Sequence, residues 1–210
     1  TLFRSPAPII PSATNPTAPN VSGPFKQGRE AGALRMSRGE GIWWSNRDDG
    51  CYVVDTSFGY NGTGAAGRGF GAVWFYRPNR ANPNLGTLTL VYAAAAVTAG
   101  NNPDNIVVSP RGGLLTCDDG SAVVDQFGTG NRLMGYTASG LAYIFAKNNV
   151  QLSDADIAAM GRTGQFLAED YRDAEWAGAC FDPTGRTLYV NVFSPGFTAA
   201  ITGPWSKGTL

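Results

Sequence analysis

The chain has 210 residues, of which 43% are hydrophobic and 15% are charged, and this length allows one sizeable hydrophobic core. Lys plus Arg and Asp plus Glu are equal at 16 each, so the chain lacks the excess positive charge that drives binding to nucleic acid. No apolar run approaches the ~20 residues that cross a bilayer, so we expect no membrane span.

Residues 1–34 are rich in proline, with Ser, Thr and Asn between the prolines. This composition disfavours both helix and interior strand and predicts an extended arm or loop without a core of its own. The sequence begins at Thr1 without an initiator methionine or a basic segment followed by an apolar one. We therefore expect that processing or fragmentation has removed what came before.

A strand–turn–strand pattern occurs three times, over residues 38–55, 102–117 and 176–192. In each copy the turn is marked by Gly, Asp or Pro, the residues that tight turns need. Further strands are expected at residues 72–76, 87–92, 132–137, 141–145 and 197–201. Four short strands in a repeated unit are typical of propeller blades.

We therefore predict an all-β fold, in which the chain forms three four-stranded blades of a β-propeller. The predicted blades span about residues 35–100, 101–152 and 173–205, within a domain of residues 35–210. A generic antiparallel sandwich is the alternative, but a sandwich does not require the same turn three times.

One segment is predicted to be helical. Ser153 with Asp156 three residues later matches a common helix start, and residues 165–172 also favour helix. Because this segment lies between the second and third blades, we expect a helical insertion over residues 153–172, packed on the rim of the propeller.

Residues 62–67 match the Gly-x-Gly-x-x-Gly pattern of dinucleotide-binding folds. Two further glycines follow and no helix begins there, so no helix N-terminus would face a pyrophosphate. We expect a loop between strands and no dinucleotide site.

The chain contains no histidine and three cysteines, Cys51, Cys117 and Cys180. A Ser-His-Asp or Cys-His arrangement therefore cannot form within the chain, and the usual zinc ligand sets are disfavoured. We expect the cysteines to be small buried hydrophobic residues. Any chemistry would depend on carboxylates, arginine, backbone groups or a metal bound through oxygen.

Glu40 and Asp104 are the candidate metal ligands. With Ala177 they align at the residue before the first strand of each copy, a position that lies at the mouth of a propeller's central channel. Converging carboxylates repel each other unless a cation lies between them. Ca²⁺ suits such a site, with backbone carbonyls and amides such as Asn105 as further ligands. The third copy has Ala177 at this position and offers no carboxylate there.

Arg38 is the candidate for binding an anion, because its guanidinium can present a forked donor to a phosphate or carboxylate. A plain ion pair between Arg38 and Glu40 is an equally good interpretation of the spacing. Asp118 and Asp119 precede Gly120, and we expect these two carboxylates to lie in a solvated turn.

Over roughly residues 35–205 the sequence resembles the C-terminal half of PhoX-type alkaline phosphatases. The similar segments are RGEGIWW (38–44), NPDNIVVSP (102–110), AGACFDPTGRTLYVN (177–191) and ITGPW (201–205). The resemblance implies a propeller of about six blades, exported by bacteria to the periplasm or the extracellular space. It also implies hydrolysis of phosphate monoesters at a channel-mouth cluster of calcium and iron, whose metals neutralise the charge of the phosphate.

Carried over to this sequence, the resemblance places Arg38 on the substrate phosphate and Glu40 on a metal, with Asp104 as a further metal ligand. The family's iron-binding cysteine belongs to the N-terminal half, and we do not assign that role to the cysteines of this chain. A three-blade chain leaves two sheet faces open, so we expect a missing N-terminal half or a partner chain to complete the propeller.

Two other functions stay open. The chain could be a non-catalytic propeller that acts as a binding or assembly subunit, which Ala177 favours because it supplies no carboxylate. It could also be a lactonase-like hydrolase, since other calcium propellers use similar carboxylates at the channel mouth.

Overall fold

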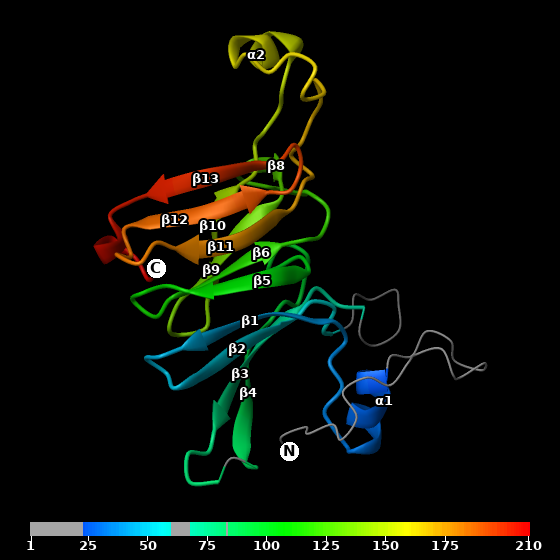
Figure 1. The fold of residues 1–210 in the computed structure, drawn as a ribbon, viewed down its shortest axis with the longest axis vertical. Coiled ribbons are helices and arrows are strands. Elements are labelled where there is room, and N and C mark those ends of the chain that lie inside the picture. Colours follow the sequence, from blue (N-terminus) through cyan, green and yellow to red (C-terminus); the bar gives the residue numbers. More distant parts are fainter. Residues whose placement is uncertain (1–22, 60–67, 83) are drawn as a thin grey trace, which may run out of the picture.

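The computed structural model describes residues 23–59, 68–82 and 84–210. These residues form three antiparallel sheets stacked in chain order, together with a two-stranded hairpin and short helices (Figure 1). We call the three sheets blades 1, 2 and 3. The predicted all-β fold is confirmed.

Antiparallel pairing fixes the order of the strands across each blade. Blade 1 consists of β1 (Gly39–Ser45), β2 (Gly50–Asp55), β3 (Ala72–Pro78) and β4 (Gly86–Ala93). Blade 2 consists of β10 (Ala142–Lys147), β9 (Arg132–Tyr136), β6 (Leu114–Asp118) and β5 (Pro103–Val108). Blade 3 consists of β11 (Trp176–Phe181), β12 (Thr187–Val192) and β13 (Phe197–Thr202). A hairpin of β7 (Val123–Asp125) and β8 (Gly128–Gly130) lies between β6 and β9 in the chain.

Blade 3 has three strands in the described part of the chain, one fewer than predicted. After β13 the chain forms the short 3-10 helix η2 (Trp205–Lys207). The indole of Trp205 packs against Phe145 of blade 2 and Phe181 of blade 3, with ring centroids 6.0 and 5.4 Å away. The C-terminal segment therefore packs across two blades and does not add a fourth strand.

The turns that join the first two strands of blades 2 and 3 explain why the pattern repeats. In blade 3, Oδ1 of Asp182 accepts a hydrogen bond from the backbone N–H of Thr187, and Gly185 has a φ of 68°. In blade 2, Oγ of Ser109 accepts a hydrogen bond from the backbone N–H of Gly113. Short polar side chains and glycine thus close both turns. The predicted turn residues Asp182 and Gly185 take part in blade 3, and in blade 2 the serine Ser109 accepts the hydrogen bond.

Blade 2 is buried on both faces. One apolar cluster lies between blades 1 and 2 and contains Val54, Val73, Ile106, Leu114, Met134 and Tyr136. A second lies between blades 2 and 3 and contains Val107, Leu115, Cys117, Leu133, Trp176, Ala179, Leu188, Val190, Val192 and Leu210. All residues of β6 and β9 are buried, which is the position expected of an interior blade.

The two outermost faces differ in chemistry. Strand pairing and alternation place Ile42, Cys51, Val53, Trp74, Tyr76, Trp44, Leu88 and Leu90 on the face that blade 1 turns away from blade 2. The same argument places Thr187, Tyr189, Asn191, Thr198, Ala200 and Thr202 on the outer face of blade 3. Blade 1 therefore has an apolar outer face and blade 3 a mostly polar one.

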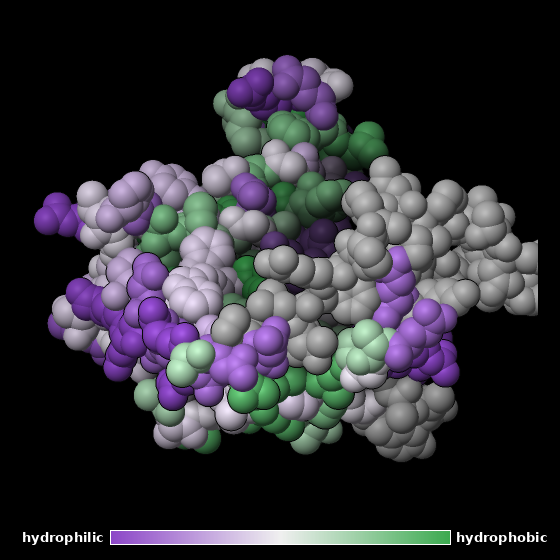
Figure 2. All heavy atoms as spheres, turned by 60° about the horizontal axis from the view of Figure 1, so that its bottom comes forward, coloured by the Kyte–Doolittle hydropathy of each residue, from purple (hydrophilic) through white to green (hydrophobic). Residues whose placement is uncertain are grey.

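Part of the blade 1 face is exposed among the described residues, since Ile42 is 62%, Trp44 46% and Leu90 43% exposed. Trp74 of the same face is half-buried and packs against Phe58. Figure 2 turns this end of the molecule toward the viewer and shows hydrophobic residues, in green, gathered there beside hydrophilic ones.

Helix α1 (Gly23–Glu30) corrects the prediction of an extended arm over residues 1–34. Pro24 lies in the first turn of this helix, where a backbone N–H has no partner within the helix, so proline costs little there. Residues 1–22 and the glycine motif of residues 62–67 lie outside the described residues. No helix in the described ranges is long and apolar enough to cross a membrane.

Helix α2 (Asp154–Ala159) begins where the sequence predicted. Oγ of Ser153 accepts a hydrogen bond from the backbone N–H of Asp156, and the Asp156 carboxylate accepts one from the Ser153 N–H. This reciprocal capping box stabilises the start of the helix.

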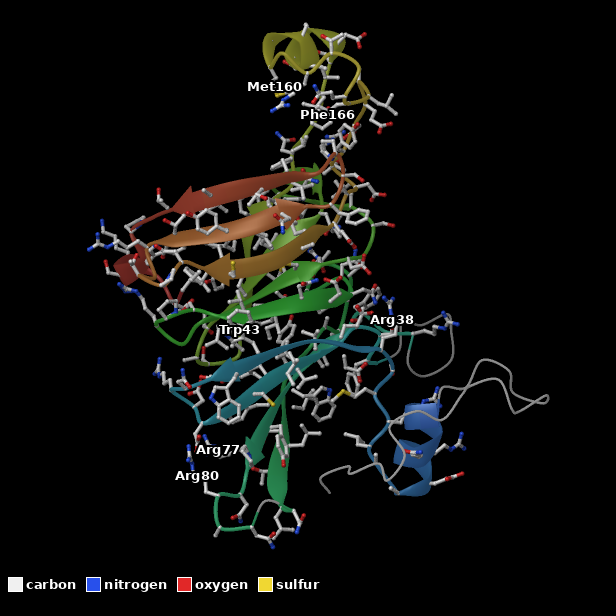
Figure 3. All side chains as sticks on the ribbon, in the orientation of Figure 1. Arg38, Trp43, Arg77, Arg80, Met160 and Phe166 are labelled. Carbon is white, nitrogen blue, oxygen red and sulfur yellow. The ribbon has the colours of Figure 1, made fainter. Side chains whose placement is uncertain are left out.

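The rest of the insertion differs from the prediction. Residues 161–172 form turns and an isolated bridge between Asp170 and Gln151 in place of a helix. Gly161 and Gly164 adopt positive φ angles of 67° and 78°, which end a right-handed helix. The insertion also projects away from the sheets and does not pack on the rim (Figure 1). Met160 and Phe166 lie in this projecting part (Figure 3).

Candidate metal centre

The innermost strands β1, β5 and β11 lie side by side, with β5 in the middle. Each pairs with its neighbour through a ladder that is interrupted by a β-bulge close to its first residue. Glu40, Asp104 and Gly178 lie within these three bulges. A bulge changes the direction of the side chain that it contains. The three bulges lie near the first residues of β1, β5 and β11, so they lie at the same edge of the stacked sheets.

The bulges of blades 2 and 3 differ in place. In blade 2 the single residue Asp104 lies between the pairs Pro103–Asp118 and Asn105–Cys117. In blade 3 Gly178 and Ala179 lie between the pairs Ala177–Asn191 and Cys180–Tyr189. Neither Ala177 nor Gly178 offers a carboxylate at this point of blade 3.

Three carboxylates nevertheless meet at this edge. Asp104 lies in the bulge of β5, Asp119 directly follows β6, and Glu175 directly precedes β11. One oxygen atom from each of the three lies within 4.8 Å of the others, and all three residues are half-buried. Blade 3 therefore contributes through Glu175, although its aligned position, Ala177, offers no carboxylate.

The repeated pattern does not mark Glu175, because this residue lies before the aligned position Ala177 of the third copy. Its signal in the sequence was an acidic residue two positions before Ala177, immediately before the first apolar residue of the strand. Backbone pairing explains its place, since the N–H of Phe193 donates to the carbonyl of Glu175 and extends the β11–β12 ladder by one residue.

The prediction that Asp118 and Asp119 lie in a solvated turn is also wrong. Asp118 is the last residue of β6 and is fully buried, paired with the equally buried Arg132 at 3.0 Å. The backbone N–H of Asp119 donates to the carbonyl of Asn102, which holds its carboxylate beside Asp104.

The electrostatics of the centre are those of carboxylates that repel one another. The pKa of Glu175 is raised to about 7, first by its hydrogen bond with Asp119, then by burial and by the charges of Asp119, Asp104 and Glu40. The pKa of Asp104 is raised as well, mainly by burial, with further contributions from Asp119 and Glu40. Without a cation, the group therefore retains a proton at a pH where isolated carboxylates are ionised.

Arg38 and Glu40 lie beside the three carboxylates. Nη2 of Arg38 lies 2.8 Å from Oε1 of Glu40 and 3.6 Å from Oδ2 of Asp119. The backbone N–H groups of Ser37 and Arg38 donate to Oδ1 of Asp55, which fixes the chain just before β1. Glu40 is not in the compact group of three, and its carboxylate is engaged by Arg38.

Asn105, which the sequence offered as a further ligand, links blades 2 and 3. Its Nδ2 donates to Oδ1 of Asp104 at 2.7 Å, and its Oδ1 accepts from the backbone N–H of Gly178 at 3.2 Å. The side chain thus orients Asp104 toward the other two carboxylates.

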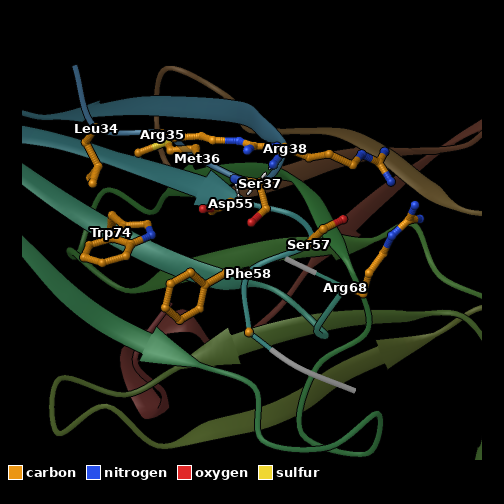
Figure 4. Close-up of a pocket in the computed structure, with 11 residues that line it drawn as sticks. Leu34, Arg35, Met36, Ser37, Arg38, Asp55, Ser57, Phe58, Arg68 and Trp74 are labelled. Carbon is orange, nitrogen blue, oxygen red and sulfur yellow. Dashed lines mark hydrogen bonds between the residues drawn. The ribbon is translucent and has the colours of Figure 1, made fainter. Parts of the chain in front are cut away.

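Arg38 also lines a cavity of about 830 Å³ on the side of blade 1 (Figure 4). Arg35 and Arg68 are the other cationic residues of its lining, and Phe58 and Trp74 form an edge-to-face aromatic pair there, with centroids 5.4 Å apart. The side chain of Arg38 therefore lies between this cavity and the three carboxylates.

The donor set of the centre fits a hard cation. Asp104, Asp119 and Glu175 provide only oxygen ligands, which Ca²⁺ prefers, and their mutual repulsion is what a bound cation would relieve. The cysteines are not part of the group. Cys117 is buried, which raises the pKa of its thiol to about 12, so this sulfur is protonated. Contrary to expectation, Cys180 is exposed and Cys51 is only half-buried.

A family model described as alkaline phosphatase PhoX matches residues 9–196. The chain belongs to this family. The resemblance stated from the sequence is thereby confirmed, and the match includes all of the residues that form the acidic group.

Among solved structures, the chain is similar to the PhoX of Pseudomonas fluorescens in complex with vanadate, a transition state analogue. The TM-score is 0.53 and the sequence identity 17%, over 83% of this chain and 34% of that chain. The likeness supports the propeller-type fold, and this PhoX-family chain spans about a third of the length of that relative. No curated protein matches the sequence.

Proposed function

We propose that this chain is part of a PhoX-like, metal-dependent phosphomonoester hydrolase, with its metal centre at Asp104, Asp119 and Glu175. The observation that carries the proposal is the convergence of these three carboxylates beside an arginine, in a chain of this family. Carboxylates this close bind a proton or a cation, and above pH 7 the cation is the favoured partner.

The carboxylates of Asp104, Asp119 and Glu175 would hold Ca²⁺, with Glu40 as a further ligand once Arg38 turns to substrate. A bound metal would supply positive charge to neutralise the phosphate and its leaving group. Iron, also expected from the family, would take its cysteine ligand from outside this chain.

Arg38 would bind the phosphate of the substrate. Half of its side chain is exposed, its guanidinium already contacts two carboxylates of the site, and its backbone is fixed by Asp55. A guanidinium binds phosphate through two parallel hydrogen bonds, which orients the ester for attack. The charge of Arg38 also offsets that of Glu40 and Asp119 when no substrate is bound.

The propeller would be completed by further blades, from an N-terminal half or from a partner chain. The apolar outer face of blade 1 supports this, because sheets of this kind pack face to face in the interior of the molecule. We propose blades at residues 35–100, 101–152 and 173–205 of a propeller of about six, in a protein of the periplasm or the extracellular space.

The test is hydrolysis of a chromogenic phosphate ester by the complete propeller. Chelation of calcium and the variant Glu175→Gln are each expected to lower activity by about 100-fold or more, by loss of the metal or one of its ligands. Asp154→Asn is the matched control, since Asp154 is an exposed carboxylate in the projecting insertion. Full activity of Glu175→Gln, or activity unaffected by chelation, would contradict the proposal.

A second candidate is a non-catalytic propeller that acts as a binding or assembly subunit. It is favoured by the first strand of blade 3, where Ala177 and Gly178 offer no carboxylate to the edge at which Glu40 and Asp104 lie. Metal analysis distinguishes the two functions, because the hydrolase requires bound calcium or iron and a scaffold requires neither.

A further inference from the structure

A buried ion pair lies behind the candidate metal centre. Arg132 of β9 and Asp118 of β6 are both 0% exposed, with Nη2 and Nε of the arginine 3.0 and 3.1 Å from Oδ2 of Asp118. Burial of two charges is costly, and apolar residues of similar size would often be at least as stabilising. The contacts of this pair therefore call for an explanation beyond stability.

The same guanidinium also donates hydrogen bonds to residues 94–102, the segment that connects blade 1 to blade 2. Nη1 of Arg132 donates to the carbonyl of Thr98 at 3.1 Å, and Nη2 donates to the carbonyl of Val97 at 2.7 Å. This connection runs directly into β5 and Asp104, six residues after Thr98. The planar, forked geometry of arginine allows one side chain to bind both a carboxylate and two carbonyls.

The end of β6 is attached to the same connection. The N–H of Asp119 donates to the carbonyl of Asn102 at 3.1 Å, and the N–H of Gly120 donates to the carbonyl of Asn101 at 3.0 Å. Arg132 thus fixes, through Asp118 and through residues 97–98, the two segments that carry Asp119 and Asp104.

We infer that Arg132 and Asp118 are positioning residues that set the distance between Asp104 and Asp119 in the metal centre. This inference rests on the proposed function. Neither residue belongs to the compact group of carboxylates, and both act through the backbone segments next to it. Residues that orient metal ligands in this way typically change metal affinity by 10- to 100-fold when they are replaced.

The test is calcium affinity, measured by calorimetric titration of the folded chain with CaCl₂. Arg132→Met is expected to weaken calcium binding about 10-fold or more. Leu133→Ala is the matched control: Leu133 is the next residue of β9, equally buried, and packs in the cluster between blades 2 and 3. This control should lower thermal stability without changing calcium affinity.

Because Arg132→Met leaves Asp118 as an unpaired buried charge and could unfold the chain, the double variant Asp118→Asn with Arg132→Gln provides a second measurement. It removes both charges and keeps polar side chains, isosteric at position 118 and shorter at position 132. A double variant that folds but binds calcium about 10-fold more weakly supports the inference, and wild-type affinity in either folded variant overturns it.

The titration separates this inference from the proposed function. If the wild-type chain binds calcium, Glu175→Gln does not and the Arg132 variants bind normally, only the positioning role fails. If the wild-type chain binds no calcium, both the metal centre and the positioning role fail.

Discussion

At the scale of single residues, Glu175 carries most of the chemistry of the candidate centre. Its carboxylate shares a hydrogen bond with Asp119 and is repelled by the negative charges of Asp104 and Glu40, and both effects raise its pKa. A proton and a calcium ion are alternative ways of balancing this charge, so binding of the metal should release a proton.

This competition predicts a pH dependence of stability. The pKa of Glu175 is about 7 in the folded chain against an ordinary value of 4.5. Because the folded state binds the proton more tightly, Glu175 adds stability below about pH 4.5, and this contribution is lost as the pH rises through about 7. We expect the Tm of the metal-free chain to fall between about pH 5 and pH 8, and calcium to restore it at the higher pH.

The control for this prediction is Glu175→Gln, whose amide does not titrate in this range. Its Tm should vary less with pH over the same interval, as measured by thermal unfolding in matched buffers. An unchanged pH dependence in this variant would show that another group is responsible.

Sequence reasoning identified some residues of the site and missed others for a physical reason. Asp104 was found because it stands in a repeated pattern, and it does lie in the acidic group. Asp119 was expected in a turn because a run of Asp before Gly is typical of turns. Glu175 lies outside the repeat. Its contact with Asp119 forms only when blade 3 packs against blade 2, and a local sequence pattern does not predict such packing.

At the scale of elements, the packing of innermost strands positions the carboxylates. A Cβ atom added to Gly41 of β1 would lie 2.6 Å from the carbonyl oxygen of Asp104 and 3.0 Å from Cα of Asn105. The backbones of β1 and β5 therefore approach each other at this point as closely as a glycine allows.

Gly41→Ala is accordingly expected to destabilise the chain by about 1–3 kcal/mol, since the added methyl group meets rigid backbone. It should also weaken calcium binding, because Asp104 lies at the point of contact. Gly203→Ala is the control, with nothing within 4 Å of its added Cβ. Chemical denaturation measures the free energy of unfolding of the two variants. Equal stability of Gly41→Ala and Gly203→Ala would contradict the close approach of the β1 and β5 backbones.

The predicted strands and the start of α2 agree with the structure because their signals are local, namely turn residues and the Ser153 cap. The length of the insertion helix was overestimated. Residues 165–172 favour helix, but Gly161 and Gly164 precede them in left-handed conformations, and the chain returns to blade 3 through turns.

At the scale of the whole molecule, the two outer faces of the stack are not equivalent. The outer face of blade 1 is apolar, with Ile42 and Leu90 in one cross-strand row, whereas that of blade 3 presents mainly Thr, Asn and Tyr189. An apolar face of this size is typical of an interface. The sequence predicted open faces, but the contrast between them depends on register and could not be predicted without it.

We therefore expect the 210-residue chain on its own to self-associate through blade 1. Ile42→Thr combined with Leu90→Thr should reduce this association, as measured by sedimentation velocity over a range of concentrations. Tyr189→Thr, on the outer face of blade 3, should leave it unchanged. A wild-type chain that stays monomeric at all concentrations would contradict the role of this face.

The central claim is that Asp104, Asp119 and Glu175 form a cation site. The most direct measurement is a crystal structure of the protein grown with calcium above pH 7. The account predicts one ion between the three side chains, with carboxylate oxygens of each at about 2.3–2.6 Å. Three carboxylates that remain without an ion at saturating calcium, or an ion bound only elsewhere, would contradict it.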